Sequence, residues 1–138
     1  MHKTILVAIL FCLTSLVQSQ NVLGFSEDEV KSYFRSNYPD LILETNARNN
    51  IYRYLKYSDL NTNLITALIF IDREGLCSSV RFIYDLSMEK DIIEELNSKF
   101  EKADEENRWI DSGSGIKIAH IFYKKEDWFI TVNYMQEQ

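Results

Sequence analysis

Cysteine, proline and glycine are scarce in this chain of 138 residues, which contains two, one and four of them. One cysteine, Cys12, lies in an apolar leader, so Cys77 would stand alone once that leader is removed. An internal disulfide is then impossible, which excludes the disulfide-stapled frameworks common among small secreted proteins. The sequence also shows no Pro/Gly/Ser-rich linker, repeat or Gly-rich phosphate loop, and it therefore predicts one compact domain.

Positive charge is the next shortage. The chain has 15 Lys and Arg against 21 Asp and Glu, a net charge of −6, and loss of Lys3 with the leader would make it −7. Nucleic acids and anionic membranes reward clustered basic residues, so we expect neither as a partner. With 46% hydrophobic and 13% aromatic residues, the chain is too apolar to be disordered, and we expect a packed core.

The most informative segment that is present is the N-terminus, where residues 1–19 have the pattern of a cleaved signal peptide. Lys3 gives a positive start, an apolar run extends from Ile5 to Val17, and Ser19 supplies a small residue at the cleavage site. The run is shorter than the roughly 20 apolar residues of a membrane span, so we expect no stable membrane insertion. Residues 20–138 are then a single domain exported to the periplasm or secreted.

Strong local signals predict a helix at the start of this domain. Ser26 and Glu29 have the spacing of a capping box, and Phe25 and Val30 that of a hydrophobic staple. Pro39 ends the helical pattern.

After this helix the apolar period changes to two, which is typical of strands. Four strands are expected, over Leu41–Thr45, Ile51–Tyr57, Leu64–Ile71 and Leu76–Tyr84. Their short connections favour an antiparallel meander. The third strand is apolar on both faces, so we expect a central strand with its second face at least partly covered.

The second half of the domain predicts a helix and further strands. Ser87 is the expected N-cap, with an apolar stripe that continues to Ala103. A short strand at 109–111 and a hairpin of residues 116–123 and 128–134 follow. The predicted fold is α+β: a helix, a four-stranded antiparallel meander, a second helix, then a short strand and a C-terminal β-hairpin, with the helices packed on one face of the sheet. In outline, the opening helix and meander resemble cystatin-like folds and other small secreted inhibitor folds, a resemblance of architecture and not of motif.

Residues able to do chemistry are few. Cys77 and His120 are the only cysteine and histidine after the leader, and a nucleophilic pair would need both in contact, oriented by a group such as Asp111. A lone cysteine on a strand is more typical of a small buried hydrophobe. One histidine and one cysteine are too few for zinc, and the Asp59 loop lacks the glycine and the final glutamate of a calcium loop. We therefore expect no metal site and no cofactor.

The aromatic residues give the one candidate binding surface. Tyr52, Arg53, Tyr54 and Tyr57 crowd a single predicted strand. The alternation of a strand places Tyr52 and Tyr54 on one face, and Arg53 and Tyr57 on the other. Exposed tyrosine beside arginine is common in protein-binding surfaces, although tyrosines on a strand also serve simply as sheet packing.

These observations favour a non-catalytic binding protein that acts outside the cytoplasm, with a protein partner or a second copy of the chain. Two alternatives stay open: an inhibitor-like module directed against a secreted enzyme, and a small hydrolase that uses Cys77 and His120.

Overall fold

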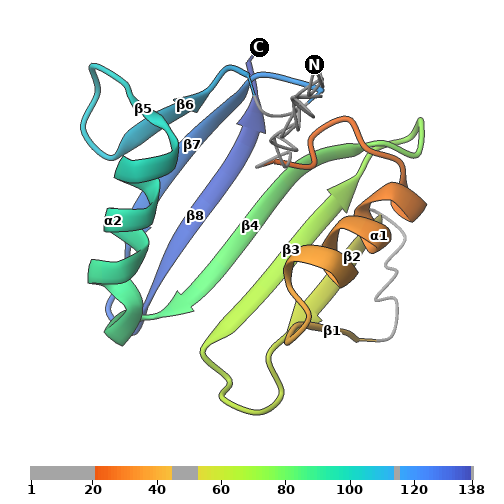
Figure 1. The fold of residues 1–138 in the computed structure, drawn as a ribbon, viewed down its shortest axis with the longest axis horizontal. Coiled ribbons are helices and arrows are strands. Elements are labelled where there is room, and N and C mark those ends of the chain that lie inside the picture. Colours follow the sequence, from red (N-terminus) through yellow and green to blue (C-terminus); the bar gives the residue numbers. More distant parts are fainter. Residues whose placement is uncertain (1–20, 45–52, 114–115, 138) are drawn as a thin grey trace, which may run out of the picture.

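A computed structural model describes residues 21–44, 53–113 and 116–137 of the chain (Figure 1). The predicted signal peptide and Tyr52 lie outside the described residues. The helices are α1 (Glu27–Asn37) and α2 (Glu89–Lys99). The strands are β1 (Ile42–Leu43), β2 (Arg53–Ser58), β3 (Ile65–Ile71), β4 (Cys77–Asp85), β5 (Glu101–Lys102), β6 (Arg108–Asp111), β7 (Ala119–Lys125) and β8 (Phe129–Gln136). The domain is thus a mixed α+β fold with two helices and an antiparallel sheet of eight strands.

The order of the strands shows that the fold consists of two similar units. Each helix is followed by four strands, and the order across the sheet is β1-β2-β3-β4-β8-β7-β6-β5. The two units meet where β4 pairs with β8 over seven Cα pairs. One 3-10 turn, η1 (Leu86–Met88), connects them along the chain. A helix followed by four antiparallel strands therefore occurs twice within one continuous sheet.

The two helices match each other in detail. Each has 11 residues and buries its fourth and eighth, which are Val30 and Phe34 in α1 and Ile92 and Leu96 in α2. The residue at each C-cap is aromatic, Tyr38 in the first unit and Phe100 in the second. The same spacing of buried residues lets both helices pack on the sheet in the same way.

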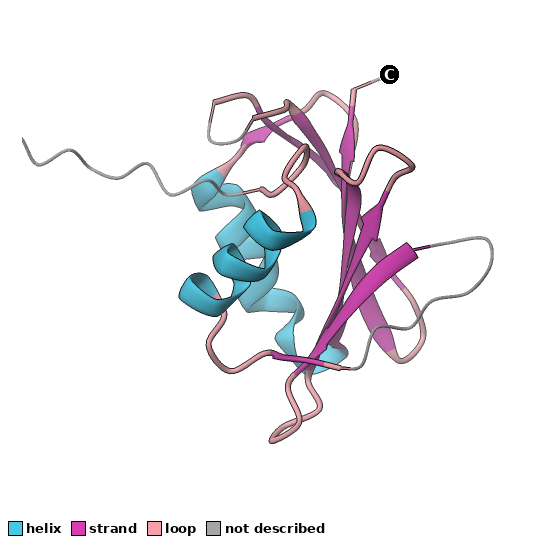
Figure 2. Cartoon of the chain, turned by 90° about the vertical axis from the view of Figure 1, so that its right-hand side faces the viewer, coloured by secondary structure: helices cyan, strands magenta, loops and turns pink. Residues whose placement is uncertain are grey.

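Both helices lie on the same side of the sheet, as the side view in Figure 2 shows. Under α1, the ring of Phe34 stacks on Tyr57 of β2 with 4.5 Å between centroids. Under α2, the indole N–H of the fully buried Trp109 on β6 donates to Asn97 Oδ1 at 3.0 Å. One layer of helices and one sheet thus enclose a single core. Among the described residues, neither helix is long and apolar enough to cross a membrane.

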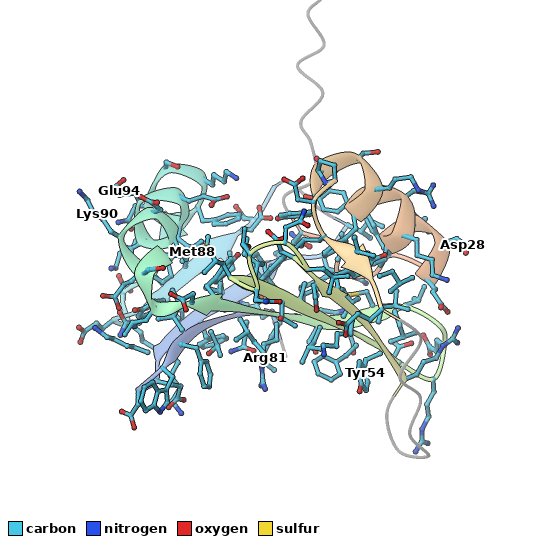
Figure 3. All side chains as sticks on the ribbon, turned by 90° about the horizontal axis from the view of Figure 1, so that it is seen from below. Asp28, Tyr54, Arg81, Met88, Lys90 and Glu94 are labelled. Carbon is cyan, nitrogen blue, oxygen red and sulfur yellow. The ribbon has the colours of Figure 1, made fainter. Side chains whose placement is uncertain are left out.

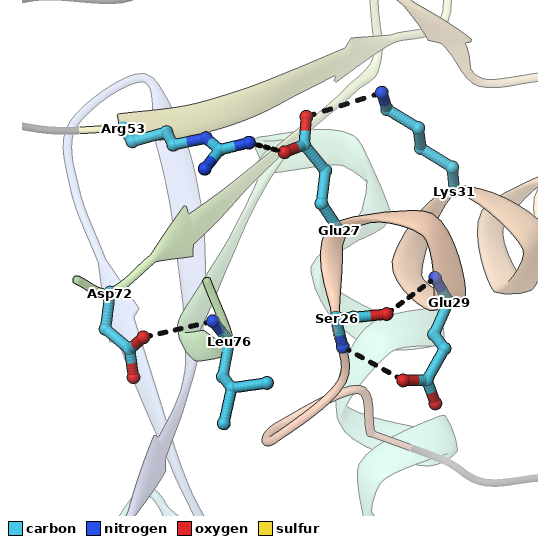
Figure 4. Close-up of polar contacts among 7 residues, drawn as sticks. All are labelled: Ser26, Glu27, Glu29, Lys31, Arg53, Asp72 and Leu76. Carbon is cyan, nitrogen blue, oxygen red and sulfur yellow. Dashed lines mark hydrogen bonds and ion pairs between the residues drawn. The ribbon is translucent and has the colours of Figure 1, made fainter. Parts of the chain in front are cut away.

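The N-terminal signals of the first helix are confirmed in detail (Figure 4). The Ser26 hydroxyl accepts from the Glu29 backbone N–H, and the Glu29 carboxylate accepts from the Ser26 N–H, each at 3.3 Å. Glu27, in the first turn, pairs with Lys31 at 3.3 Å and with Arg53 on β2. These contacts fix α1 against the edge of the sheet.

The start of the second helix differs from the prediction. Ser87 is not its N-cap but lies inside the 3-10 turn, where its N–H donates to the Asp85 carboxylate at 3.0 Å. The helix also ends earlier, at Lys99, because the next residue, Phe100, is already extended. The chain then enters the short strand β5, which the sequence did not indicate.

The outer edges of the sheet are short. β1 and β5, which lie at its two ends, have two residues each. Long outer strands invite pairing with other chains, and short outer strands are one way in which proteins limit it.

Candidate functional site: the open face of the sheet

The side of the sheet that faces away from both helices is the largest surface that they leave uncovered. Along β3, alternate residues Ala67, Ile69 and Ile71 are buried, whereas Leu68 and Phe70 between them are only half-buried. Figure 3 shows Tyr54 and Arg81 pointing away from the helices on this side. We call it the open face. The sequence predicted that the second face of β3 is at least partly covered. Neither helix covers it.

One row of side chains crosses the middle of the open face from strand to strand. The cross-strand register places these residues in the order Lys56, Leu68, Arg81, Asn133, Phe122 and Arg108. One or two apolar or neutral side chains thus separate each cation from the next. The Arg81 Nε–H donates to Asn133 Oδ1 at 2.7 Å, which restrains the guanidinium.

A second row runs beside the first and is more apolar. The register gives its order as Tyr54, Phe70, Ser79, Met135, His120 and Ile110. The rings of Tyr54 and Phe70 lie 6.1 Å apart, while Met135 is 43% exposed. The two rows together form a surface of aliphatic and aromatic side chains that also carries arginines, in a chain whose net charge is −6.

The second unit contains a shallow depression of this face, with a volume of about 430 Å³. Arg108, His120, Phe122, Met135 and Glu137 are among its lining residues. A guanidinium nitrogen of Arg108 contacts His120 Nδ1. The guanidinium carbon of the same residue lies 5.3 Å from the centre of the Phe122 ring. A planar cation held beside an aromatic ring suits recognition of a carboxylate.

The structure separates the residues of the predicted tyrosine surface. Tyr54 lies on the open face, and Arg53 and Tyr57 lie on the opposite side, toward α1. Arg53 is occupied by Glu27, and Tyr57 is only 5% exposed because Phe34 stacks on it. Burial accordingly raises the pKa of the Tyr57 hydroxyl. Among the described residues of the predicted tyrosine surface, only Tyr54 therefore lies on the open face.

The three candidates for nucleophilic chemistry do not come together. Cys77 is fully buried in the core, and burial raises the pKa of its thiol to about 12. His120 on β7 lies on the open face, whereas Asp111 on the adjacent strand β6 pairs with Ala119, faces the helix side and accepts from Asn21 at 2.6 Å. A thiol needs access and a base beside it to act as a nucleophile, and this arrangement supplies neither.

The described part of the chain offers little for a metal ion. Its His, Cys, Asp and Glu side chains form no group of three that could hold one. Asp59 instead accepts from the backbone N–H groups of Asn61 and Thr62 at 3.0 and 3.2 Å, which closes the loop between β2 and β3. A hydrogen bond from the Thr62 side chain, followed by those from the Thr62 and Asn61 backbone N–H groups, lowers the pKa of the Asp59 carboxyl.

A small cavity of about 40 Å³ lies between the two helices, where the two units meet. Tyr33, Tyr38, Tyr84 and Tyr134 line it together with Glu95. Burial, followed by neighbouring tyrosines and Glu95, raises the pKa of Tyr38, Tyr84 and Tyr134, so these phenols stay neutral. The space suits ordered water, and it is too small for most organic ligands.

Sequence reasoning missed most of the open face. The residues it missed there are Leu68, Phe70, Arg81, Phe122, Met135 and Arg108. They come from five different strands, so no local motif connects them. The apolar second face of β3 was the one signal that pointed to them.

The comparisons with known proteins add no family: no family model matches the chain, and no curated protein or solved structure matches it at a significant level.

Proposed function

We propose that this chain is an exported, non-catalytic binding protein that holds a protein partner against its open face. The observation that carries the proposal is that neither helix covers one side of an eight-stranded sheet, and that this side displays apolar and aromatic side chains among arginines. Aromatic residues, methionine and arginine are the types enriched in protein interfaces.

The chemistry of the face favours a protein over other partners. Apolar side chains at Leu68, Phe70 and Met135 offer area for hydrophobic contact. Arg81 is held in place by Asn133, so little side-chain freedom is lost when it binds. The alternative of a hydrolase loses support because Cys77 and His120 lie apart, one in the core and one on the open face.

The proposal is tested by photo-crosslinking from the open face. A photoreactive residue replaces Thr66, which lies on this face of β3 beside Leu68, and crosslinking is done in the native exported fraction. We expect a defined protein adduct. Leu68→Asp should reduce it by about tenfold or more, because a carboxylate would be pressed into an apolar contact, and 1.4 kcal/mol already gives a factor of ten.

Leu60→Asp is the matched control, since Leu60 is 54% exposed in the loop before β3, outside the strands that form the open face. It introduces the same charge and should leave the adduct unchanged. Circular dichroism of both variants checks that they fold. Equal loss in both variants, or no adduct from Thr66, would refute the open face as the binding surface.

A further inference from the structure

We propose that the depression formed by Arg108 and His120 on the open face binds a carboxylate, supplied by an acidic side chain of an extended segment of the partner. This inference rests on the proposed function and names the chemistry that the partner must bring. It depends on two buried polar atoms that lack a hydrogen-bond partner within the described residues, Arg108 Nε and His120 Nε2.

Both of these atoms are donors. Arginine remains protonated at any physiological pH, so the Arg108 nitrogen that contacts His120 Nδ1 must donate to it. Nδ1 is then the acceptor of the imidazole, and the ring hydrogen lies on Nε2. His120 is only 9% exposed, so its Nε2–H cannot turn freely to water. A buried donor without an acceptor is costly, and a ligand oxygen would satisfy it.

The chain's own acids show which chemistry fits. Glu105, which is 71% exposed, reaches another Arg108 nitrogen at 3.2 Å. Glu137, which is 62% exposed, approaches His120 Nε2 but stops at 3.8 Å, beyond hydrogen-bonding distance. A carboxylate therefore already stands at the mouth of the site without filling it. We expect an incoming carboxylate that displaces Glu137 to accept from His120 Nε2 and to pair with the Arg108 guanidinium.

The surroundings indicate an acidic side chain of a peptide. Phe122 and Met135 flank the depression and offer apolar contact to residues next to the acid. Arg81, in the same row as Arg108, adds a second positive charge to the face and is hydrogen-bonded to the neutral Asn133. Lys56 at the end of the row is instead paired with Glu44 at 2.9 Å. Arg81 and Arg108 lie on this face although the net charge of the chain is −6, and this local positive charge is complementary to an acidic partner. A second copy would bring the same arginines to the contact.

The test measures binding of a short peptide in which a glutamate is flanked by leucines, and of its twin with glutamine in place of the glutamate. Calorimetry and the NMR signals of the His120 ring report on the full domain. We expect the glutamate peptide to bind at least about tenfold more tightly than its twin, with a shift of the His120 signals. Arg108→Gln should abolish this preference, whereas Arg35→Gln, which removes the same charge from α1, should preserve it.

Removal of the internal competitor gives a second readout. Glu137→Gln should tighten binding of the glutamate peptide several-fold. Glu126→Gln, which removes an equal charge in the turn between β7 and β8, should leave the affinity unchanged. Equal gains from both would indicate general electrostatic attraction and would overturn the site.

Three further outcomes would overturn the inference: no preference for glutamate over glutamine, equal affinity for free glutarate, or binding to phosphatidylglycerol vesicles that exceeds binding to the peptide. If the preference is absent while Leu68→Asp still removes the crosslinked adduct, the carboxylate site is refuted and the binding face is retained. If the preference for glutamate is absent and Leu68→Asp also leaves the crosslinked adduct unchanged, the proposed function is refuted as well.

Discussion

Cys77 shows at the scale of one residue how burial decides chemistry. Its side chain is fully buried at the start of β4, and burial raises the pKa of the thiol to about 12. The thiolate, which is the reactive form, is then almost absent at neutral pH. We predict that a maleimide probe at pH 7.5 leaves the native protein unlabelled and labels it completely in denaturant, as mass spectrometry can measure. Rapid labelling of the native protein would contradict the described packing of this strand.

The candidate site was predictable from the sequence only in part, and single residues show why. Alternation along one strand correctly separated Tyr54 from Arg53 and Tyr57. It could not say which of the two faces the helices cover, because that choice depends on packing between distant elements. Arg81 and Arg108 are 27 positions apart in sequence and meet in one row only through the pairing of β4, β8, β7 and β6.

At the scale of elements, the capping box of α1 is the clearest agreement between sequence and structure. Both of its reciprocal hydrogen bonds are present, between Ser26 and Glu29. We predict that Ser26→Ala lowers the free energy of unfolding by about 1 kcal/mol, because an N–H at the helix start loses its acceptor. Urea denaturation measures this change. Ser32→Ala, at an exposed position inside the same helix, should have little effect or stabilise slightly. Equal losses in the two variants would show that the cap contributes nothing.

The elements that were predicted wrongly from the sequence are those that consist of only a few residues. β5 has two residues and is defined only by its pairing with β6. The predicted helical stripe continued to Ala103, whereas Ala103 and the acidic residues 104–106 lie in the turn between β5 and β6. Periodicity needs several residues to be visible, so a helix that stops one turn early and a two-residue strand leave no clear trace.

At the scale of the whole molecule, the tyrosines between the two units predict how the protein responds to alkali. Burial raises the pKa of Tyr84 and Tyr134 above the value near 10 of an exposed tyrosine. A raised pKa in the folded state stabilises the fold fully below pH 10, and that stabilisation is lost as the pH rises through the folded pKa. We predict cooperative unfolding above pH 10. Absorbance of phenolate at 295 nm from these residues should rise together with the loss of circular dichroism. A complete rise with the dichroism unchanged would contradict their burial.

The repeat of one helix and four strands appears only at this largest scale. The helices match in length and in the positions of their buried residues. Their sequences nevertheless have the same residue only at the first and tenth positions. Physical constraints act on the spacing of apolar residues and not on their identity. For this reason the sequence showed no repeat although the architecture contains one.

The turn that joins the two units has a further consequence. Leu86–Met88 is the one covalent link between them, while the β4–β8 ladder and the core that both helices cover hold them side by side. A cut in this turn would leave two pieces that each keep a helix and its four strands, and all seven cross-strand pairs between them would remain available for reassembly. The architecture therefore suits a split protein, in which two separately made fragments regain the fold only when they meet.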